Sequence, residues 1–239
     1  MANFKLPYYK EHLDFNIADE LVAGVLVSKV EDYVPTNTES GLVEEALANP
    51  IGHKPLSELA IGKKHIVIIS SDHTRPVPSH VTMPILLKHV RKNNPDVLVT
   101  ILIATGMHRP TTYEELVAKY GQKIVDEEKI VIHDAYKDED MTFKGILPSG
   151  GELWVNKLID SADLLMSEGF IEPHFFAGFS GGRKSVLPGI ASKKTVLWNH
   201  NAKFIANKNA RAGNLQDNPI HRDMLFAAKA ANLEFILNV

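Results

Sequence analysis

The alternation of apolar and polar residues predicts a succession of strands and helices from residue 65 onwards. Short apolar runs rich in β-branched residues indicate buried strands, at residues 65–70, 97–105, 129–134, 162–169 and 233–239. Helical spacing of apolar residues, bounded by cap and stop residues, indicates helices, at residues 83–94, 111–121, 192–199 and 219–231. Strands that alternate with helices are typical of an α/β fold with a doubly wound, mostly parallel, Rossmann-like sheet.

The two ends of the chain give a less regular pattern. Residues 21–30 (LVAGVLVSKV) fit a strand, and residues 41–49 (GLVEEALAN) fit a helix. The chain stops on the strand predicted at 233–239, without a closing helix. This ending fits an edge strand, and it also fits a chain that continues.

Composition narrows the class of protein. The 239 residues are 44% hydrophobic and 23% charged, as expected for a globular protein with a full core. A net charge of -3 gives no general attraction to nucleic acid or to an anionic membrane. We find neither a membrane-spanning apolar run nor a signal peptide, and we expect a cytoplasmic protein. Cysteine is absent, so a soft metal would have to obtain sulfur from outside the protein.

Unusual polar residues gather where three of the predicted strands end. The segments are SSDHTRPVPS (70–79), TGMHRP (105–110) and GFIEPHFFAGFSGGRKS (169–185). In open α/β sheets, ligands bind beyond the carboxyl ends of the strands. We therefore expect a shared site that contains Asp72, His73, Thr74, Arg75, His108, Arg109 and His174, with His200 from WNHN (198–201) close by.

Each of these residues also has an ordinary structural explanation. Asp72 can bond its own backbone in a turn while Arg75 pairs with a surface carboxylate. His108 can be a loop residue, His174 a packed core residue, and His200 a cation that stabilises a helix end. It is their joint placement at strand ends that favours function. The remaining histidines have no such setting, and we interpret them as surface or packing residues: His12, His53, His65, His80, His89, His133 and His221.

The segment GFSGGRKS (178–185) is similar to a phosphate-binding P-loop, but Arg183 stands where the second glycine of the motif belongs. Its glycines allow close approach of the backbone to a ligand, and a helix starting after them would direct N–H groups at an anion. Arg183 blocks the turn that wraps a triphosphate, which disfavours a kinase or an ATPase. The role of Lys184 is left open by this comparison.

Two histidines on one cavity would suit a reaction that works on both faces of a substrate, such as racemisation. Imidazole can give or take a proton near neutral pH, and Arg75 offers a planar fork for a carboxylate. The α-proton of a 2-hydroxy acid is only weakly acidic. Removing the hydroxyl proton while a hydride leaves the carbon is easier, but it needs a hydride acceptor, which must be a cofactor.

The segments SDHTRPVPS, ATGMHRP and EGFIEPHFFAGFSGGRKSVLPGI, with the pair NH at 199–200, resemble the motifs of the nickel-pincer-nucleotide-dependent lactate racemase family. The resemblance runs from about residue 15 to the end of the chain, and the block at 169–190 is the most specific part of it. It implies the N-terminal, cofactor-binding and catalytic domain of a two-domain enzyme, for which we take residues 1–239. The family's second domain follows this point.

The resemblance also implies a cofactor, pyridinium-3,5-bisthiocarboxylic acid mononucleotide with nickel held by its sulfur-bearing arms. One arm is joined to a lysine as a thioamide, and the matching residue is Lys184. A histidine that matches His200 completes the nickel ligands. Such a cofactor would bring its own sulfur, in keeping with the missing cysteine. Other proteins synthesise it and insert the nickel, and they would be partners.

The same resemblance implies roles at the substrate. His108 and His174 match the paired acid/base residues, and Arg75 lies near the substrate carboxylate. The segment that contacts the cofactor matches Asp72, His73, Thr74 and Arg75. One histidine removes the proton of the 2-hydroxyl group while a hydride passes to the cofactor, giving a pyruvate-like intermediate. The hydride then returns to the opposite face, which interconverts L- and D-lactate or a similar 2-hydroxy acid.

Three other functions stay open at this point. The glycine loop fits a nucleotide-binding or phosphoryl-transfer domain, against which Arg183 counts. His108, His174 and His200 fit a zinc hydrolase by residue type, although not by spacing. A chain without the family's second domain also fits a non-catalytic binding module.

Overall fold

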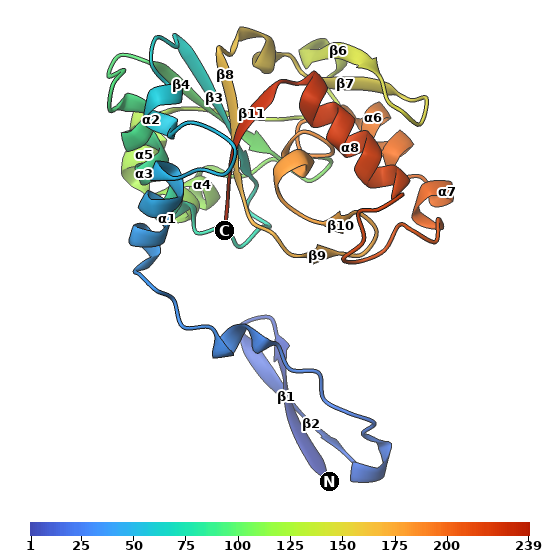
Figure 1. The fold of residues 1–239 in the computed structure, drawn as a ribbon. Coiled ribbons are helices and arrows are strands. Elements are labelled where there is room, and N and C mark those ends of the chain that lie inside the picture. Colours follow the sequence, from blue (N-terminus) through green and yellow to red (C-terminus); the bar gives the residue numbers. More distant parts are fainter. The chain divides into compact units, whose positions relative to one another are not determined.

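A computed structural model describes residues 1–239, apart from the side chain of Glu31, and the chain divides into two parts at Thr38. The N-terminal part covers Met1–Thr38, and the α/β part covers Glu39–Val239. Both are drawn in Figure 1, which colours the chain from blue at the N-terminus to red at the C-terminus.

The N-terminal part contains an antiparallel hairpin of β1 (Ala2–Tyr8) and β2 (Glu11–Ile17). Its strands turn at Tyr9, which has a φ of 55°. Phe4 lies opposite Phe15, and Leu6 lies opposite Leu13 on the same face. That face is therefore apolar. Two short 3₁₀ helices follow, η1 (Asp19–Leu21) and η2 (Lys29–Asp32).

The strand predicted over residues 21–30 is wrong. Residues 22–28 have no regular secondary structure, and the side chain of Leu26 is fully exposed. A strand needs a neighbour that satisfies its backbone N–H and C=O groups. Among the described residues, β1 and β2 pair with each other and no strand pairs with this segment. An apolar run without a partner has stayed irregular.

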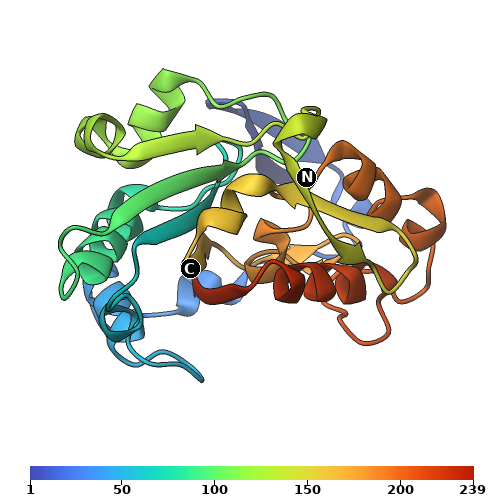
Figure 2. The same cartoon turned by 90° about the horizontal axis from the view of Figure 1, so that it is seen from above.

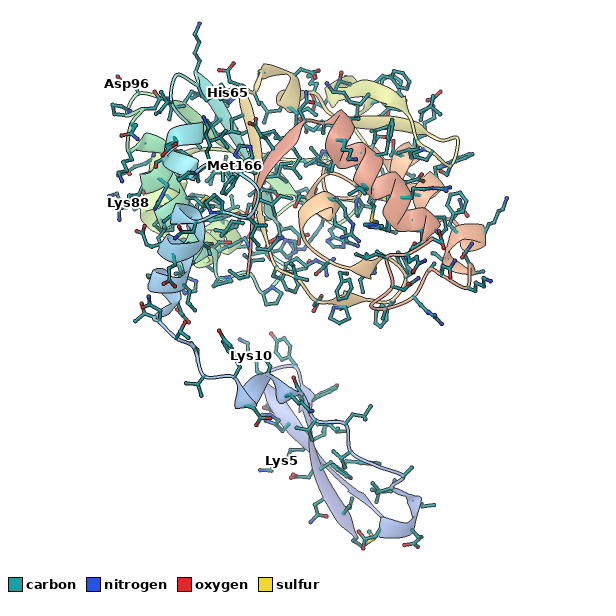
Figure 3. All side chains as sticks on the ribbon, viewed as in Figure 1. Lys5, Lys10, His65, Lys88, Asp96 and Met166 are labelled. Carbon is teal, nitrogen blue, oxygen red and sulfur yellow. The ribbon has the colours of Figure 1, made fainter. Side chains whose placement is uncertain are left out.

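The α/β part is built on a parallel sheet that confirms the expected α/β class. In the described chain this sheet has five strands, in the order β11–β8–β3–β4–β5. They lie close to the predicted ranges: β3 (His65–Ser71), β4 (Leu98–Ala104), β5 (Lys129–Ile132), β8 (Leu164–Gly169) and β11 (Leu233–Asn238). Met166 of β8 is fully buried, and Figure 3 shows it inside the molecule, with Lys88 and Asp96 at the surface.

The strand order creates a crevice beside β3. Along the chain, β3, β4 and β5 follow one another towards one edge of the sheet, and β8 and β11 are then added on the other side of β3. The loops that leave β3 and β8 at their carboxyl ends therefore separate, and a ligand site is expected at such a reversal. Ser70 of β3 lies beside Glu168 of β8 at this end of the sheet.

Helices cover one face of the sheet (Figures 1 and 2). The two helices predicted at 41–49 and 111–121 are confirmed. Their apolar residues join those of β3, β4 and β8 in one core, in which Leu47, Leu86 and Ile101 are fully buried. The helices are α1 (Glu39–Ala48), α2 (Leu56–Leu59), α3 (Ser79–Arg91), α4 (Tyr113–Tyr120) and α5 (Gln122–Glu127).

Helix α3 starts earlier than the predicted range of 83–94. A helix that began at residue 83 would have Pro84 in its first turn, where a missing N–H costs nothing. The helix instead begins at Ser79, because the carbonyl of Pro78 accepts from the N–H groups of Val81 and Thr82 at 2.9 and 3.1 Å. Pro84 consequently lies inside the helix.

The other face carries a second core, covered by a hairpin and by the C-terminal helices. The hairpin consists of β6 (Met141–Ile146) and β7 (Glu152–Asn156) and was not predicted. Helices α6 (Lys193–Asn199) and α8 (Pro219–Ala230) confirm the predicted ranges 192–199 and 219–231. Short elements complete this side: α7 (Ala202–Ile205), η3 (Asp138–Asp140), η4 (Lys157–Ser161), η5 (Gly182–Ser185), β9 (Pro173–His174) and β10 (Gly178–Phe179).

A membrane span is not found among the described residues, where every helix is too short or too polar to cross a bilayer.

Candidate active site

A cavity of about 300 Å³ opens at the reversal of the strand order. It is lined by the loops that follow β3, β4 and β8, so the three polar segments of the sequence do meet. The predicted residues that line it are Asp72, Arg75, His108, His174, Lys184 and His200. Among the described residues, His73 and Thr74 do not line this cavity.

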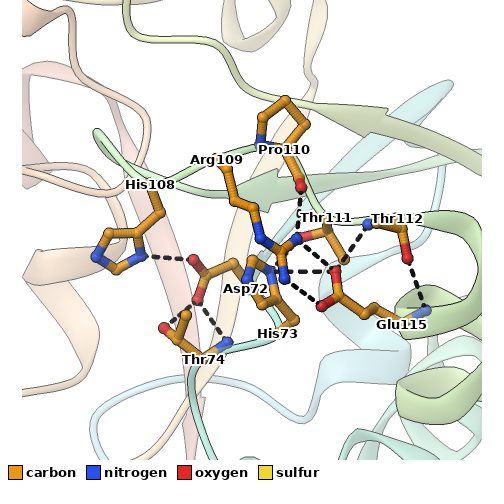
Figure 4. Close-up of polar contacts among 9 residues, drawn as sticks. All are labelled: Asp72, His73, Thr74, His108, Arg109, Pro110, Thr111, Thr112 and Glu115. Atoms are coloured by element: carbon orange, nitrogen blue, oxygen red, sulfur yellow. Dashed lines mark hydrogen bonds and ion pairs between the residues drawn. The ribbon is translucent and has the colours of Figure 1, made fainter.

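Asp72 and His108 form a hydrogen-bonded pair at the wall of the cavity (Figure 4). The distance between Asp72 Oδ2 and His108 Nδ1 is 2.6 Å. Burial alone would raise the pKa of Asp72, but hydrogen bonds from Thr74 and His108 lower it below the usual value. An ionised carboxylate only accepts, so Nδ1 of His108 carries a proton, and in the neutral tautomer the lone pair is on Nε2. The turn that would give Asp72 an ordinary structural role is also present, since Thr74 N–H donates to Asp72 Oδ1 at 3.1 Å.

His73 and Arg109 belong to a neighbouring network at the start of α4 (Figure 4). Arg109 donates two hydrogen bonds to Glu115, and its guanidinium lowers the pKa of Glu115 to about 2. Nδ1 of His73 lies 3.0 Å from Thr111 Oγ1. Thr112 caps the helix through a reciprocal bond with Glu115. These side chains position the loop that carries His108.

Arg75 has an exposed side chain at the mouth of the cavity. Among the described side chains no ion pair involves Arg75, so the pairing with a surface carboxylate that would have given it an ordinary structural role is not found there. Its positive charge acts on other residues of the site, because it helps to lower the pKa of both His174 and Lys184. The guanidinium fork is therefore available for an anionic group.

The glycine loop ends in the short turn η5 and not in the long helix that a P-loop would begin. Gly181 has a φ of 74°, and a Cβ there would lie 2.8 Å from the Phe170 carbonyl oxygen, so a side chain is excluded. The side chain of Arg183 folds back against the start of the loop and the residues before it. Its guanidinium donates to the carbonyls of Ala177 and Phe179 and to Nδ1 of His221.

Lys184 is mostly enclosed in this turn and lines the cavity. Burial lowers its pKa to about 7, and the positive charges of Arg183 and Arg75 add to the effect. A large part of the population thus carries a neutral amine near pH 7. A neutral amine is a nucleophile, whereas an ammonium group is not.

His174 and His200 lie on either side of Phe176, whose ring meets each imidazole edge-on. Burial lowers the pKa of both histidines to about 4, helped by the charge of Lys184. His200 is therefore neutral at pH 7 and does not act as a cation that stabilises the helix end, which was the ordinary structural explanation for it. Its Nδ1 is buried and has no hydrogen-bond partner among the described residues.

Sequence reasoning missed Glu168, which lines the cavity, and His221, which supports the glycine loop. Glu168 is the next-to-last residue of β8, is 1% exposed and lines the cavity. A glutamate at the exit of an apolar strand was the available signal. His221 was interpreted as a packing residue, but it accepts the Nε–H of Arg183 at 2.8 Å. Only its place in the fold beside the glycine loop reveals that contact.

The donor set fits a metal that receives most of its ligands from a cofactor. No group of three or more His, Cys, Asp or Glu side chains that could hold a metal occurs among the described residues. The zinc-hydrolase alternative thus gains no support. Neutral His200, with a buried nitrogen that lacks a partner, fits a single imidazole ligand, and Lys184 fits a point of attachment.

Comparison with known families gives one clear match. The model of the lactate racemase N-terminal domain matches residues 8–213. The chain is 58% identical over 239 residues to the curated lactate racemase of Thermoanaerobacterium thermosaccharolyticum. It is 56% identical over the same length to that of Lactiplantibacillus plantarum. All of this chain is matched, but it spans only 56% of each relative.

Solved structures agree with this match. The lactate racemase apoprotein from T. thermosaccharolyticum superposes with a TM-score of 0.92 at 57% identity, covering 100% of this chain and 55% of that one. A crystal structure of a Thermotoga maritima protein superposes with a TM-score of 0.68 at 24% identity, over 83% of this chain and 50% of that one. The second likeness concerns the fold alone.

Proposed function

Because this chain belongs to the family of lactate racemase N-terminal domains, we propose that the protein containing it interconverts L-lactate and D-lactate. Residues 1–239 would supply the cofactor-binding and catalytic domain. The observation that carries the proposal is the meeting on one cavity of His108, His174 and Arg75, whose guanidinium has no ion-pair partner among the described side chains. A racemase of another 2-hydroxy acid would use the same groups.

His108 is suited to accept the proton of the substrate's 2-hydroxyl group. Its Nδ1–H is bound by Asp72, so Nε2 is the nitrogen with a lone pair. When Nε2 takes a proton, the adjacent carboxylate stabilises the imidazolium that forms. Arg75 would hold the substrate carboxylate with a charge-assisted, bidentate contact.

His174 is suited to serve the opposite face of the substrate. With a pKa near 4 it is neutral at pH 7, and the cations around it disfavour a permanent charge. Proton removal from the 2-hydroxyl group by either histidine, together with loss of the C2 hydrogen as a hydride, would give the same planar, pyruvate-like ketone. Racemisation then requires that the ketone be reduced from either face.

We propose that the hydride acceptor is a nickel-pincer nucleotide, which when bound would supply the two-electron chemistry that no side chain provides. Lys184 would hold it covalently and His200 would donate a nitrogen to the nickel. Of the segment Asp72, His73, Thr74 and Arg75, which was expected to contact the cofactor, Asp72 and Arg75 line the cavity and would contact it directly. In this arrangement the protein depends on partners that make the cofactor and insert the metal, and on a small-molecule substrate.

The activity is tested in the full-length, cofactor-loaded protein by following D-lactate formation from L-lactate with chiral chromatography. His108→Ala and His174→Ala should each lower kcat by about 10²–10⁴-fold. His80→Ala, an exposed histidine outside the cavity, is the matched control. Retained activity in a cavity variant removes that histidine from the mechanism. Faster turnover of a larger 2-hydroxy acid would reassign the substrate.

Cofactor attachment is tested without any rate measurement. Peptide mass spectrometry of the loaded protein should find an added mass on Lys184. Nickel content after dialysis should fall in His200→Ala. An unmodified Lys184 in active protein would contradict covalent attachment. Unchanged nickel content in His200→Ala would contradict the proposed role of His200 as a nickel ligand.

A further inference from the structure

Glu168 is a buried carboxylate that takes no part in the proton transfers proposed above. It is the next-to-last residue of β8, which lies beside the central strand β3. Its side chain accepts hydrogen bonds from the hydroxyl groups of Ser70, Ser79 and Thr82. All three donors are fully buried. A buried carboxylate needs such donors, and the donors are equally dependent on it.

The three donors come from both ends of one loop. Ser70 lies near the end of β3, whereas Ser79 and Thr82 belong to the first turn of α3. Oε2 of Glu168 accepts from Ser70 at 2.6 Å and from Ser79 at 3.1 Å, so a single oxygen joins the two ends. Thr82 donates to Oε1. The loop between these points, residues 71–78, carries Asp72 and Arg75.

Helix α4 extends this arrangement to the neighbouring loop. The hydroxyl of Tyr120 donates to Ser70 Oγ at 2.7 Å, and Lys119 Nζ donates to Ser71 Oγ at 3.3 Å. The same helix begins directly after the loop of His108. Contacts through Ser70 and Ser71 therefore link the base of one loop to the helix that follows the other.

We propose that Glu168 is a positioning residue, which closes the loop of residues 71–78 at its base and so holds Asp72 against Nδ1 of His108. A loop with both ends joined to one carboxylate has little freedom to shift. The 2.6 Å contact between Asp72 and His108 depends on that fixed geometry. The inference rests on the proposed function only for the catalytic role of His108.

The test compares Glu168→Ala with Glu168→Gln in the full-length protein. Alanine removes the acceptor and should loosen the loop. The low-field proton resonance of His108 Nδ1–H should then shift or broaden, and amides of residues 72–78 should exchange faster. In the loaded enzyme kcat should fall about 100-fold, as for a displaced catalytic group. Glutamine has the same shape as glutamate and keeps one acceptor oxygen. The Glu168→Gln variant should therefore stay close to wild type in all three measurements.

Glu128→Ala is the matched control for a general loss of stability. Glu128 is also a buried carboxylate, but its partner is Arg91 at the far end of α3. This variant should leave the His108 resonance in place. If Glu168→Ala does not fold, the double variant Ser79→Ala with Thr82→Ala removes the donors on one side of the loop and should cause the same changes.

The outcomes separate the positioning role from the proposed function. An unchanged His108 resonance in Glu168→Ala would overturn the positioning role. Loss of activity in Glu168→Gln with the resonance intact would show that the charge of Glu168 acts directly, which also overturns it. A shifted resonance with unchanged kcat would support positioning and instead count against His108 as a catalytic residue.

Discussion

At the scale of single residues, the two histidines proposed as acid and base, His108 and His174, have opposite surroundings. His108 bonds the carboxylate of Asp72, whereas His174 lies near the positive charges of Lys184, Arg75 and Arg183. A carboxylate favours the imidazolium form, and neighbouring cations disfavour it. The two groups are thus not equivalent, and their contributions can be separated by changing what surrounds each.

Asp72→Asn should weaken catalysis more than folding. The amide cannot carry the charge that stabilises an imidazolium, and it can turn its NH₂ group towards His108 and favour the wrong tautomer. We expect kcat to fall by about 10²–10⁴-fold, with the fold retained in circular dichroism. Asp96→Asn, at the surface in Figure 3, is the control. A kcat within a few-fold of wild type would show that the pair is only structural.

Lys184→Met should stabilise the cofactor-free protein, and more so at low pH. The folded pKa of about 7 lies below the unfolded value of 10.5. Between these values the unfolded chain binds more protons, so wild-type stability rises with pH, and the full cost of the buried charge is present below pH 7. Methionine has no such cost. The gain in Tm by calorimetry should be larger at pH 6 than at pH 9.

Lys203→Met, an exposed lysine, controls for the substitution itself. Its effect on Tm should be small at both pH values. An equal gain for Lys184→Met at pH 6 and pH 9 would mean that the amine is not perturbed in the folded protein.

At the scale of elements, the loops of the site are held by the helices that follow them. Thr112 caps α4 through Glu115, and Glu115 also binds Arg109 from the loop of His108. Thr112→Ala should lower the free energy of unfolding by about 1 kcal/mol, measured by urea denaturation. Thr112→Ser keeps the hydroxyl group and should restore most of it. If serine is as damaging as alanine, the cap is not the cause.

The elements that were predicted are those with strong local signals. Strands β3, β4 and β8 each contain a run of apolar residues, and α4 has a cap, an acidic first turn and a terminal glycine. The hairpins β1–β2 and β6–β7 mix polar residues into their strands and were missed. Alternation of Phe4 and Leu6 with polar residues was a usable signal for β1. The run at 21–30 failed because pairing is a property of the whole fold and not of the segment.

The candidate site was predictable as a set of loops but not as a set of contacts. Parallel strands bring their carboxyl ends to one edge, so Asp72, His108 and His174 were expected together. The bond between Asp72 and His108 joins residues 36 positions apart and depends on the order β3–β4. Lowered pKa values likewise arise from burial, which the sequence around Lys184 does not reveal.

At the scale of the whole molecule, the cavity is assembled within the α/β part. Among the described residues, both core clusters begin at or after Val43, and the residues that line the cavity run from Ser71 to His200. The N-terminal part has its own hairpin, with Leu6, Leu13 and Phe15 exposed by 47, 52 and 46%. Stability of the sheet should therefore be independent of residues 1–38.

A variant of the full-length protein that lacks residues 1–38 tests this independence. Because the deletion removes no residue of either core cluster, the Tm of the sheet should change by only a few degrees, equivalent to less than about 1 kcal/mol. The His108 resonance should stay unchanged as well, since Asp72 and Glu168 keep their contacts. Phe4→Ser with Leu13→Ser, which alters only the apolar hairpin face, is the milder comparison. A large fall in Tm after deletion, matched by the double substitution, would show instead that this face is part of the folded core of the complete protein.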